Sequence, residues 1–262
     1  MIKGSFHNHT TYSDGKNTPR EMIEEALRLG LTSIGISDHS YTAFDIDYCM
    51  SPESEKEYIA EIRALKEEYK DRINVLLGIE LDYYTGSFPS EYDYIIGSLH
   101  YLDDGKEHYS VDLSPEEALR CINNVFNNNK YAYAEAYFEK IADFVCSGKI
   151  NVIGHFNLIT KYEKSGLDFD KDNPVYVNAW KKAMDRMAGK AILEINTGAI
   201  KYGRKDVPYP SEDMLTYWNS LGGKVIYSAD AHYSDALMQY SDMVEEMIFR
   251  LGLTRAESPL DI

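Results

Sequence analysis

A His-Asn-His triplet near the start of the chain contains the first residues whose types and spacing suit metal chemistry. His7 and His9 are separated by one residue, so in a strand both side chains would point to the same face. Asp14 follows in the loop Tyr12-Ser13-Asp14-Gly15. Imidazole and carboxylate groups together are ligands that Zn, Mn and Fe(II) accept. The spacing therefore predicts part of a metal site.

Further imidazoles and carboxylates follow predicted strands along the whole chain. Six of the seven histidines occur at a strand end, and only His108 is expected in a surface loop. A lone histidine of this kind is more often a hydrogen-bonded core residue, but the joint placement favours a shared site. The candidate metal ligands are His7, His9, Asp14, His39, Glu80, His100, His155, Asp230 and His232.

Nine nitrogen and oxygen ligands exceed what one ion usually takes, so two or three divalent ions with bridging carboxylates are expected. The sequence does not choose among Zn, Mn and Fe. Three such ions bring six positive charges, which Asp14, Glu80 and Asp230 offset only in part. The resulting positive pocket would attract a phosphate group and stabilise its transition state.

Two basic residues after later predicted strands are candidates for binding that phosphate. Lys161 ends the segment Leu158-Ile159-Thr160-Lys161, and Arg204 stands on a loop with Gly203. A guanidinium can contact phosphate oxygens in pairs, although both residues would also suit a solvated surface.

Three polar residues at the same strand ends leave two interpretations open. Asp38 could orient the imidazole of His39 or could be only a polar strand-end residue. Glu194 and Asn196 could bind polar groups of a substrate or hydrogen-bond neighbouring loops.

Short apolar runs alternate with helical patterns from one end of the chain to the other. The predicted strands are 2–6, 32–37, 74–79, 92–99, 151–154, 191–195 and 224–229. Thr18 and Glu21 form a capping box that begins one helix, and Ser114 and Glu117 form another. Further helices are predicted at 54–69, 175–188, 211–221 and 236–250, with a break at Asn127–Asn129 in the region from Ser114 to Cys146.

Strict alternation of strands and helices implies a parallel sheet with helices outside it. A closed barrel brings the carboxyl ends of all strands to one face, whereas an open sheet spreads them along an edge. Candidate ligands at nearly every strand end therefore favour a single seven-stranded βα barrel. No linker divides the sequence, so residues 1–262 are expected to form one domain.

Composition restricts the partners. A net charge of −16 argues against nucleic acid, because polyanion binding normally needs a basic face. No apolar run approaches the ~20 residues that span a bilayer. Three scattered cysteines and the lack of a signal peptide favour the cytoplasm.

These motifs resemble the PHP (polymerase and histidinol phosphatase) superfamily along almost the whole chain. The matching segments are His7-Asn8-His9, Ser13-Asp14-Gly15, Ser37-Asp38-His39, Gly78-Ile79-Glu80, Gly97-Ser98-Leu99-His100, Gly154-His155 and Ser228-Ala229-Asp230-Ala231-His232. Length and the segments after Gly154 and Leu193 resemble the stand-alone histidinol-phosphate phosphatases.

The resemblance implies a distorted (β/α)7 barrel with an active site of three metal ions at the carboxyl ends of the strands. It assigns His7, His9, Glu80 and Asp230 to one ion, Glu80, His100 and His155 to a second, and Asp14, His39 and His232 to a third. Arg204 matches the phosphate-binding arginine of the family in position.

The implied activity is hydrolysis of L-histidinol phosphate to L-histidinol and phosphate, in histidine biosynthesis. Water activated by the metals would attack phosphorus in line, with Asp230 or His232 as the proton carrier. The segment from Tyr41 to Ser51 and the helices of 114–146 are expected to cover the mouth. The alternatives are a phosphoesterase for nucleotides or short nucleic acids and a non-catalytic metal-binding module.

Overall fold

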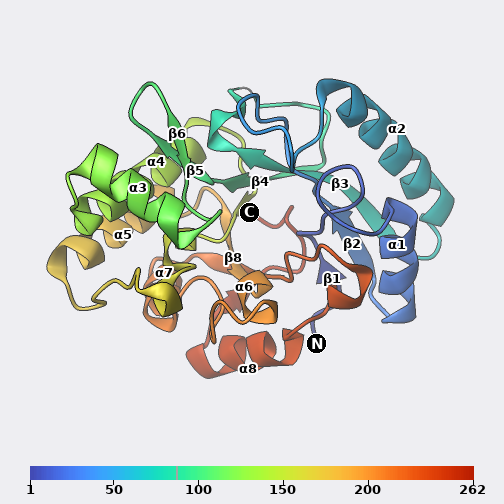
Figure 1. Cartoon of the computed structure of the whole chain (residues 1–262). Helices are drawn as coiled ribbons and strands as arrows, with labels where there is room; N and C mark the ends of the chain where they lie inside the picture. The colour runs from blue at the N-terminus through green and yellow to red at the C-terminus, as the bar shows by residue number, and fades with distance from the viewer. Residues whose placement is uncertain (87) are drawn as a thin grey trace.

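Eight parallel strands form one curled sheet at the centre of the molecule, with helices packed around it (Figure 1). The structure is a computed structural model that describes residues 1–86 and 88–262. Along the sheet the strands are β1 (Gly4–Ser5), β2 (Ser33–Ile36), β3 (Asn74–Asp82), β4 (Tyr94–Ser98), β7 (Val152–Ile153), β8 (Ile192–Asn196), β9 (Lys224–Ser228) and β10 (Thr254–Arg255). The seven predicted strands are all present and lie in chain order, as a (β/α) barrel requires.

A pair of hydrogen bonds above β1 and β9 connects the two ends of the seven-stranded array. The amide of His9 donates to the carbonyl of Ala231 at 2.8 Å, and the amide of Ala231 donates to the carbonyl of His7 at 3.1 Å. Asn8 and Ala231 thereby form an isolated parallel bridge. This closure brings the first and last ligand motifs of the chain side by side, although more than 220 residues separate them.

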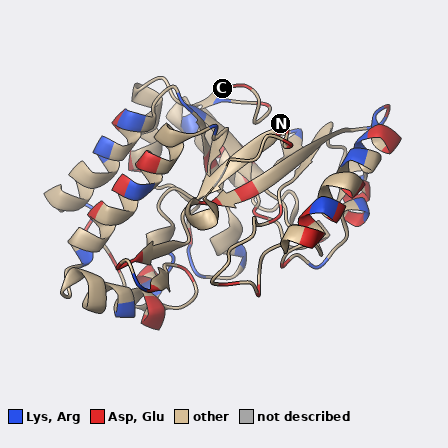
Figure 2. Ribbon diagram, turned by 90° about the horizontal axis from the view of Figure 1, so that it is seen from above, with Lys and Arg blue, Asp and Glu red and all other residues tan. Residues whose placement is uncertain are grey.

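Helices follow most strands and cover the outside of the sheet. They are α1 (Pro19–Arg28), α2 (Pro52–Tyr69), α3 (Pro115–Phe126), α4 (Lys130–Ser147), α5 (Pro174–Met187), α6 (Gly198–Lys201), α7 (Glu212–Ser220) and α8 (Ser241–Leu251). Figure 2 shows basic and acidic residues along these outer helices, whereas most of the sheet carries neither. No helix in the described ranges is long and apolar enough to cross a membrane.

Side-chain caps fix where most of the helices begin. Thr18 and Glu21 form the predicted capping box at α1. Ser114 caps α3 by accepting from the amide of Glu117, but the reciprocal bond of a capping box is missing among the described contacts. Asn127 and Asn128 adopt positive φ angles of 51° and 62°, which ends α3 where the asparagine run predicted a break.

Two features of the sheet region were not predicted. Residues 101–110 form an antiparallel hairpin of β5 (Tyr101–Asp103) and β6 (His108–Ser110), so His108 lies in a strand and not in a loop. Its ring stacks on that of Phe44, with centroids 3.7 Å apart. The second feature is β10, whose two residues pair with β9. Both elements are too short to give a recognisable period of alternation.

The inside of the sheet is filled by side chains from nearly every strand. They form a cluster of Phe6, Leu76, Tyr94, Ile96, Val152, Ile192, Ile226 and Ala256. Tyr94 reaches across this space and donates its hydroxyl hydrogen to the carbonyl of Phe6. Glycines at 35 and 78 make room for it, because a Cβ at either position would lie 2.2 Å from an atom of the Tyr94 side chain. The large side chain of Tyr94 thus requires glycine at both neighbouring positions.

We expect Gly35→Ala to lower the free energy of unfolding by about 1–3 kcal/mol, because the added methyl group collides with the Tyr94 hydroxyl. Combined with Tyr94→Phe, the loss should be smaller than the sum of the two single losses, since the shorter ring relieves the collision. Urea unfolding of the four proteins at constant pH measures this coupling. Additive losses would show that the two positions are not in contact.

Candidate metal centre

All nine candidate ligands lie at the carboxyl end of the sheet and converge on one mouth. The alternation within the first triplet explains how. His7 and His9 point inward, while Asn8 points away and donates from its side chain to the carbonyl of Gly35 at 2.8 Å. Glu80 lies within β3, and the remaining ligands follow β1, β2, β4, β7 and β9. The structure thus brings together residues that are spread over the entire chain.

Glu80 is the centre of this group and is only 1% exposed. Its Oε2 atom lies 2.8 Å from Nδ1 of His39 and 3.3 Å from Nε2 of His7. Its Oε1 atom lies 3.0 Å from Nε2 of His155 and 3.4 Å from Nε2 of His100. One carboxylate therefore faces imidazoles from both sides, which is the arrangement of a bridging ligand.

Potential ligand atoms gather into three overlapping groups, within each of which all atoms lie within 4.8 Å of one another. The groups are His9, Asp14, His39 and His232; His7, His9 and Asp230; and His39, Glu80 and His100. His155 belongs to none of them, but its Nε2 atom is in contact with Glu80. The groups share His9 and His39, so their boundaries differ from those that the family resemblance implies.

Several imidazoles are held from behind so that one ring nitrogen faces the cluster. Nδ1 of His7 contacts Oε2 of Glu194 at 2.9 Å, and Nδ1 of His100 contacts Oδ2 of Asp82 at 3.2 Å. Nδ1 of His232 donates to the carbonyl of Asp230 at 3.1 Å. A carboxylate or a carbonyl accepts the hydrogen on Nδ1, so that Nε2 points inward and would offer its lone pair to a cation that displaces its proton.

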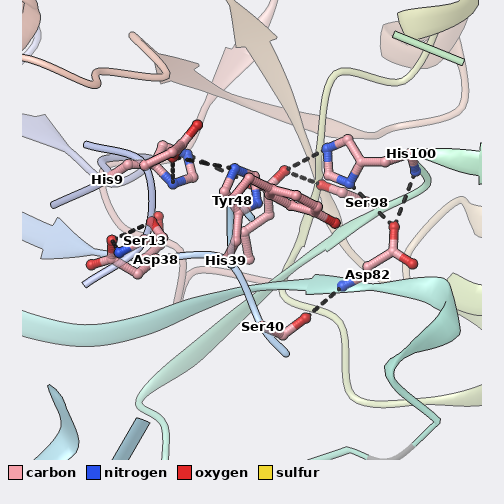
Figure 3. Close-up of polar contacts among 12 residues, drawn as sticks. His9, Ser13, Asp38, His39, Ser40, Tyr48, Asp82, Ser98 and His100 are labelled. Atoms are coloured by element: carbon pink, nitrogen blue, oxygen red, sulfur yellow. Dashed lines mark hydrogen bonds and ion pairs between the residues drawn. The ribbon is translucent and has the colours of Figure 1, made fainter. Parts of the chain in front are cut away.

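The loop that carries Asp14 is held by Asp38 (Figure 3). Oδ1 of Asp38 accepts from the amide of Thr10 at 2.7 Å and from the amide of Ser13 at 3.2 Å. Asp38 therefore does not orient the ring of His39, and it is more than a polar residue at a strand end. It fixes the turn after β1. Glu194 and Asn196 form hydrogen bonds with neighbouring residues instead of facing the cavity. The side-chain amide of Asn196 donates to Glu194 at 2.8 Å.

Burial and mutual contact shift the pKa values strongly in opposite directions. Burial by itself would raise the pKa of Glu80, but the imidazoles of His39, His7 and His100 hold it well below its ordinary value. Burial would lower the pKa of His7, but Glu194 and Glu80 raise it well above its ordinary value. The carboxylates therefore remain ionised, and the surrounding site favours positive charge.

The same cluster contains buried polar atoms that have no hydrogen-bond partner in the described part of the chain. They include both ring nitrogens of His9, Nε2 of His7, Oε2 of Glu80 and Oδ1 of Asp14. Burial, with the neighbouring His39 and His232, lowers the pKa of His9 to about 4, so its ring stays neutral. Neutral imidazoles and ionised carboxylates are the states that coordinate cations, and the residues fit divalent metal ions.

A cavity of about 660 Å³ opens above this cluster. Asp14, His39, His100, His155, Asp230 and His232 lie at its base. Its walls include residues of the segment 41–51, as expected, but no described residue of helices α3 and α4, which were also expected to cover the mouth. The segment from Ser110 to Leu113, after the β5–β6 hairpin, takes that place.

Both candidate phosphate-binding residues line this cavity, in different electrostatic settings. Nζ of Lys161 lies 2.7 Å from Oδ2 of Asp112, a carboxylate that the sequence did not single out. Arg204 lies over the ring of Tyr162, 5.5 Å from its centroid, and has no carboxylate within 4.0 Å among the described residues. Arg204 thus keeps its full charge for a ligand.

Asp82 and Asp112 are two carboxylates at the candidate site that the sequence analysis did not single out. The predicted strand ended at Ile79, whereas β3 continues to Asp82. With the longer strand, the two-residue period would have placed Asp82 on the same face as Glu80. Asp112 follows a hairpin without a periodic signal, so its pairing with Lys161 had no sequence indicator.

The part of the chain that contains most of these residues matches a known protein family. The family model for the PHP domain matches residues 5–198, which include every candidate ligand except Asp230 and His232. The chain belongs to the PHP domain family. A Deinococcus radiodurans protein named as a probable histidinol-phosphatase is 30% identical over 92% of this chain and 91% of its own length.

Two solved structures have the same fold. A Listeria monocytogenes protein assigned as a histidinol phosphatase superposes with a TM-score of 0.78 over 92% of this chain and 99% of its own, at 19% identity. The histidinol phosphate phosphatase of Lactococcus lactis was solved with zinc, L-histidinol and phosphate. It superposes with a TM-score of 0.70 over 97% of this chain and 95% of its own, at 21% identity. At these identities the likeness concerns the barrel alone.

The metal-free PHP chain should lose stability as pH rises from about 6.5 to 9. Burial lowers the pKa of His232, but Asp14 and Asp230 raise it from 6.5 to about 9. A raised pKa stabilises the folded state fully below 6.5, and this contribution is lost as pH rises through 9. His232→Asn should remove that part of the decline, on the order of 1–3 kcal/mol.

Urea unfolding in the presence of a chelator, at pH 6, 7.5 and 9, measures the difference between the two proteins. Equal slopes against pH for wild type and His232→Asn would contradict the assignment. Saturation with zinc should reverse the trend and stabilise wild type more than His232→Asn as pH rises, because the cation competes with the proton for a ring that the variant lacks.

Proposed function

We propose that this chain is a metal-dependent phosphomonoester hydrolase that converts L-histidinol phosphate to L-histidinol and phosphate. The observation that carries the proposal is the meeting of nine imidazole and carboxylate ligands below a cavity whose wall bears an uncompensated arginine. The curated relatives of similar length that are named for this activity support the choice of substrate. Residues 1–262 would act as one domain.

The proposed centre holds three divalent ions, Zn, Mn or Fe, on the nine ligands. Bound ions would lower the pKa of a water molecule and neutralise the phosphoryl oxygens. Glu80 would bridge, because its two oxygens face different sets of imidazoles. Glu194, Asp82 and the carbonyl of Asp230 would keep His7, His100 and His232 in the correct tautomers.

Asp230 is better placed than His232 to exchange a proton with the reacting groups. Nδ1 of His232 already donates to a carbonyl, and its Nε2 would be a ligand, so no ring atom is left. Oδ1 of Asp230 lies 3.3 Å from Nε2 of His9, whereas Oδ2 accepts only an amide hydrogen of Asn196 at 3.2 Å. Oδ2 therefore remains available at the base of the cavity.

Arg204 and Lys161 would hold the phosphate, and a buried lysine fixes the loops that carry them. Nζ of Lys205 donates to Oγ1 of Thr160 at 3.0 Å and contacts Oε2 of Glu163 at 2.8 Å. Lys205 adjoins Arg204 and Thr160 adjoins Lys161, so this contact joins the two cation-bearing loops. Both cations then face the same cavity without further ordering.

Phosphate release from a panel of esters tests the proposal directly. Wild-type protein loaded with zinc or manganese should hydrolyse L-histidinol phosphate in preference to nucleotides and short oligonucleotides. Preference for nucleotides would favour a nucleotide phosphoesterase instead. Absence of turnover on every ester with full metal loading would favour a non-catalytic metal-binding module.

Glu80→Gln should lower both metal content and turnover, because an amide cannot bridge cations among buried imidazoles. We expect metal content to fall by about one ion or more and activity to fall on the order of 10²-fold or more. Elemental analysis and phosphate release on the same sample measure both. The exposed Glu57→Gln on α2 is the matched control. Full metal content in Glu80→Gln would refute the bridging role.

Arg204→Ala should weaken turnover while leaving bound metal unchanged. Loss of one charge-assisted contact to phosphate should lower kcat/KM for L-histidinol phosphate by about 10–100-fold. Lys164→Ala removes an exposed cation that pairs with Asp206 and does not line the cavity, so it serves as the control. If Arg204→Ala also loses metal, then Arg204 maintains the centre and does not bind phosphate.

A further inference from the structure

The cavity has two walls of opposite charge. Arg204 and Lys161 follow β8 and β7, whereas Asp45 and Asp47 belong to the segment between β2 and α2. The strands run around the barrel in the order β1-β2-β3-β4-β7-β8-β9, and the bridge above β1 and β9 closes the ring. In this ring β2 is three or four strands away from both β7 and β8, whichever way the strands are counted. The carboxylates and the cations therefore face one another across the mouth.

The carboxylate of Asp45 is held in place and is not neutralised. Its Oδ2 atom accepts from the hydroxyl of Tyr101 at 2.8 Å. Neither Asp45 nor Asp47 has a lysine or arginine within 4.0 Å in the described portion of the chain, whereas Asp112 and Asp103 each pair with a lysine. An uncompensated negative charge on a cavity wall is suited to a cationic group of a ligand.

The segment that carries Asp45 is fixed to the adjacent hairpin. The ring of Phe44 stacks on His108 and meets the ring of Tyr101 edge-on, with centroids 4.9 Å apart. Tyr48, in the same segment, lies edge-on to the ring of His39, with centroids 4.9 Å apart (Figure 3). These contacts hold the carboxylate in position before a ligand arrives, which reduces the ordering cost of binding.

Another polar group in the same cavity lacks a hydrogen-bond partner among the described residues. Tyr209 is 2% exposed and lines the cavity, and its hydroxyl has no hydrogen-bond partner within the described ranges. A buried, unpaired hydroxyl is costly unless a ligand or water satisfies it. Together with a volume of about 660 Å³, this indicates a polar molecule of small-metabolite size.

We propose that Asp45, assisted by Asp47, binds the ammonium group of the substrate and makes the enzyme selective for phosphomonoesters that carry a positive charge. This inference rests on the proposed hydrolysis and adds the group that selects the ester. L-Histidinol phosphate has an ammonium group and an imidazole a few bonds from its phosphate. With the phosphate at the metals and Arg204, the cationic end would extend toward Asp45.

Asp45→Asn tests the role of the charge, because the amide oxygen still accepts from Tyr101 and keeps the segment in place. Relative to wild type, kcat/KM for L-histidinol phosphate should fall about 10–100-fold more than kcat/KM for p-nitrophenyl phosphate, which has no cation. The exposed Asp71→Asn, outside the cavity, is the control and should not change this ratio. Equal losses on both esters would overturn the proposal.

Inhibition by the two products provides a second measurement. In assays with p-nitrophenyl phosphate, Asp45→Asn should weaken inhibition by L-histidinol about 10-fold and inhibition by inorganic phosphate much less. Arg204→Ala should show the reverse pattern. If both variants weaken both inhibitors equally, the cavity does not have separate ends and the proposal fails.

The failure of the proposed substrate can be recognised separately by including O-phosphoethanolamine and glucose 6-phosphate. If wild type prefers O-phosphoethanolamine to both L-histidinol phosphate and glucose 6-phosphate, and Asp45→Asn removes the preference over glucose 6-phosphate, histidinol phosphate is wrong but Asp45 still selects cations. If wild type shows no preference for cationic over neutral esters, the role of Asp45 is wrong.

Discussion

A buried carboxylate surrounded by imidazoles is the constraint on which the rest of the structure depends. Glu80 is almost fully enclosed and has ring nitrogens on both of its oxygens. A carboxylate at such a site is tolerated only where positive charge compensates it. Protons on the imidazoles supply some of that charge, and divalent cations would supply more. The fold must therefore hold mutually repelling and desolvated groups at fixed separations.

Backbone closure and outer contacts provide that rigidity. The hydrogen bonds of the His9 and Ala231 amides join the ends of β1 and β9 directly beside the candidate ligands that follow both strands. Asp38 fixes the turn that carries Asp14, and Glu194 lies behind His7. Asp230 itself has a positive φ of 51°, an uncommon conformation for a residue other than glycine. The contacts of the neighbouring residues hold Asp230 in this strained backbone conformation.

The barrel and the convergence of the candidate ligands at its mouth could be predicted because both follow from local patterns. Strand–helix alternation gives a parallel sheet, and His7, His39, Glu80 and Asp230 each stand where an apolar run ends. Contacts between distant segments left no such pattern. Asp112 pairs with Lys161, and Tyr101 holds Asp45, only because the β5–β6 hairpin folds over the mouth. A three-residue strand carries too little periodicity to place that hairpin.

An excess of acidic residues is compatible with a phosphate ester because charge acts locally here. Screening in physiological salt limits surface charges to about 8 Å, so acidic residues on the outer helices contribute little inside the mouth. Within the mouth, charge is separated: Arg204 lies on one side, Asp45 on the other, and the cluster of candidate metal ligands at the base. A dianionic phosphate and an ammonium group in one molecule would each meet the opposite sign, whereas a polyanion would meet Asp45 and Asp47. If the proposed substrate is correct, the same arrangement would favour a small zwitterionic ester over a nucleic acid strand.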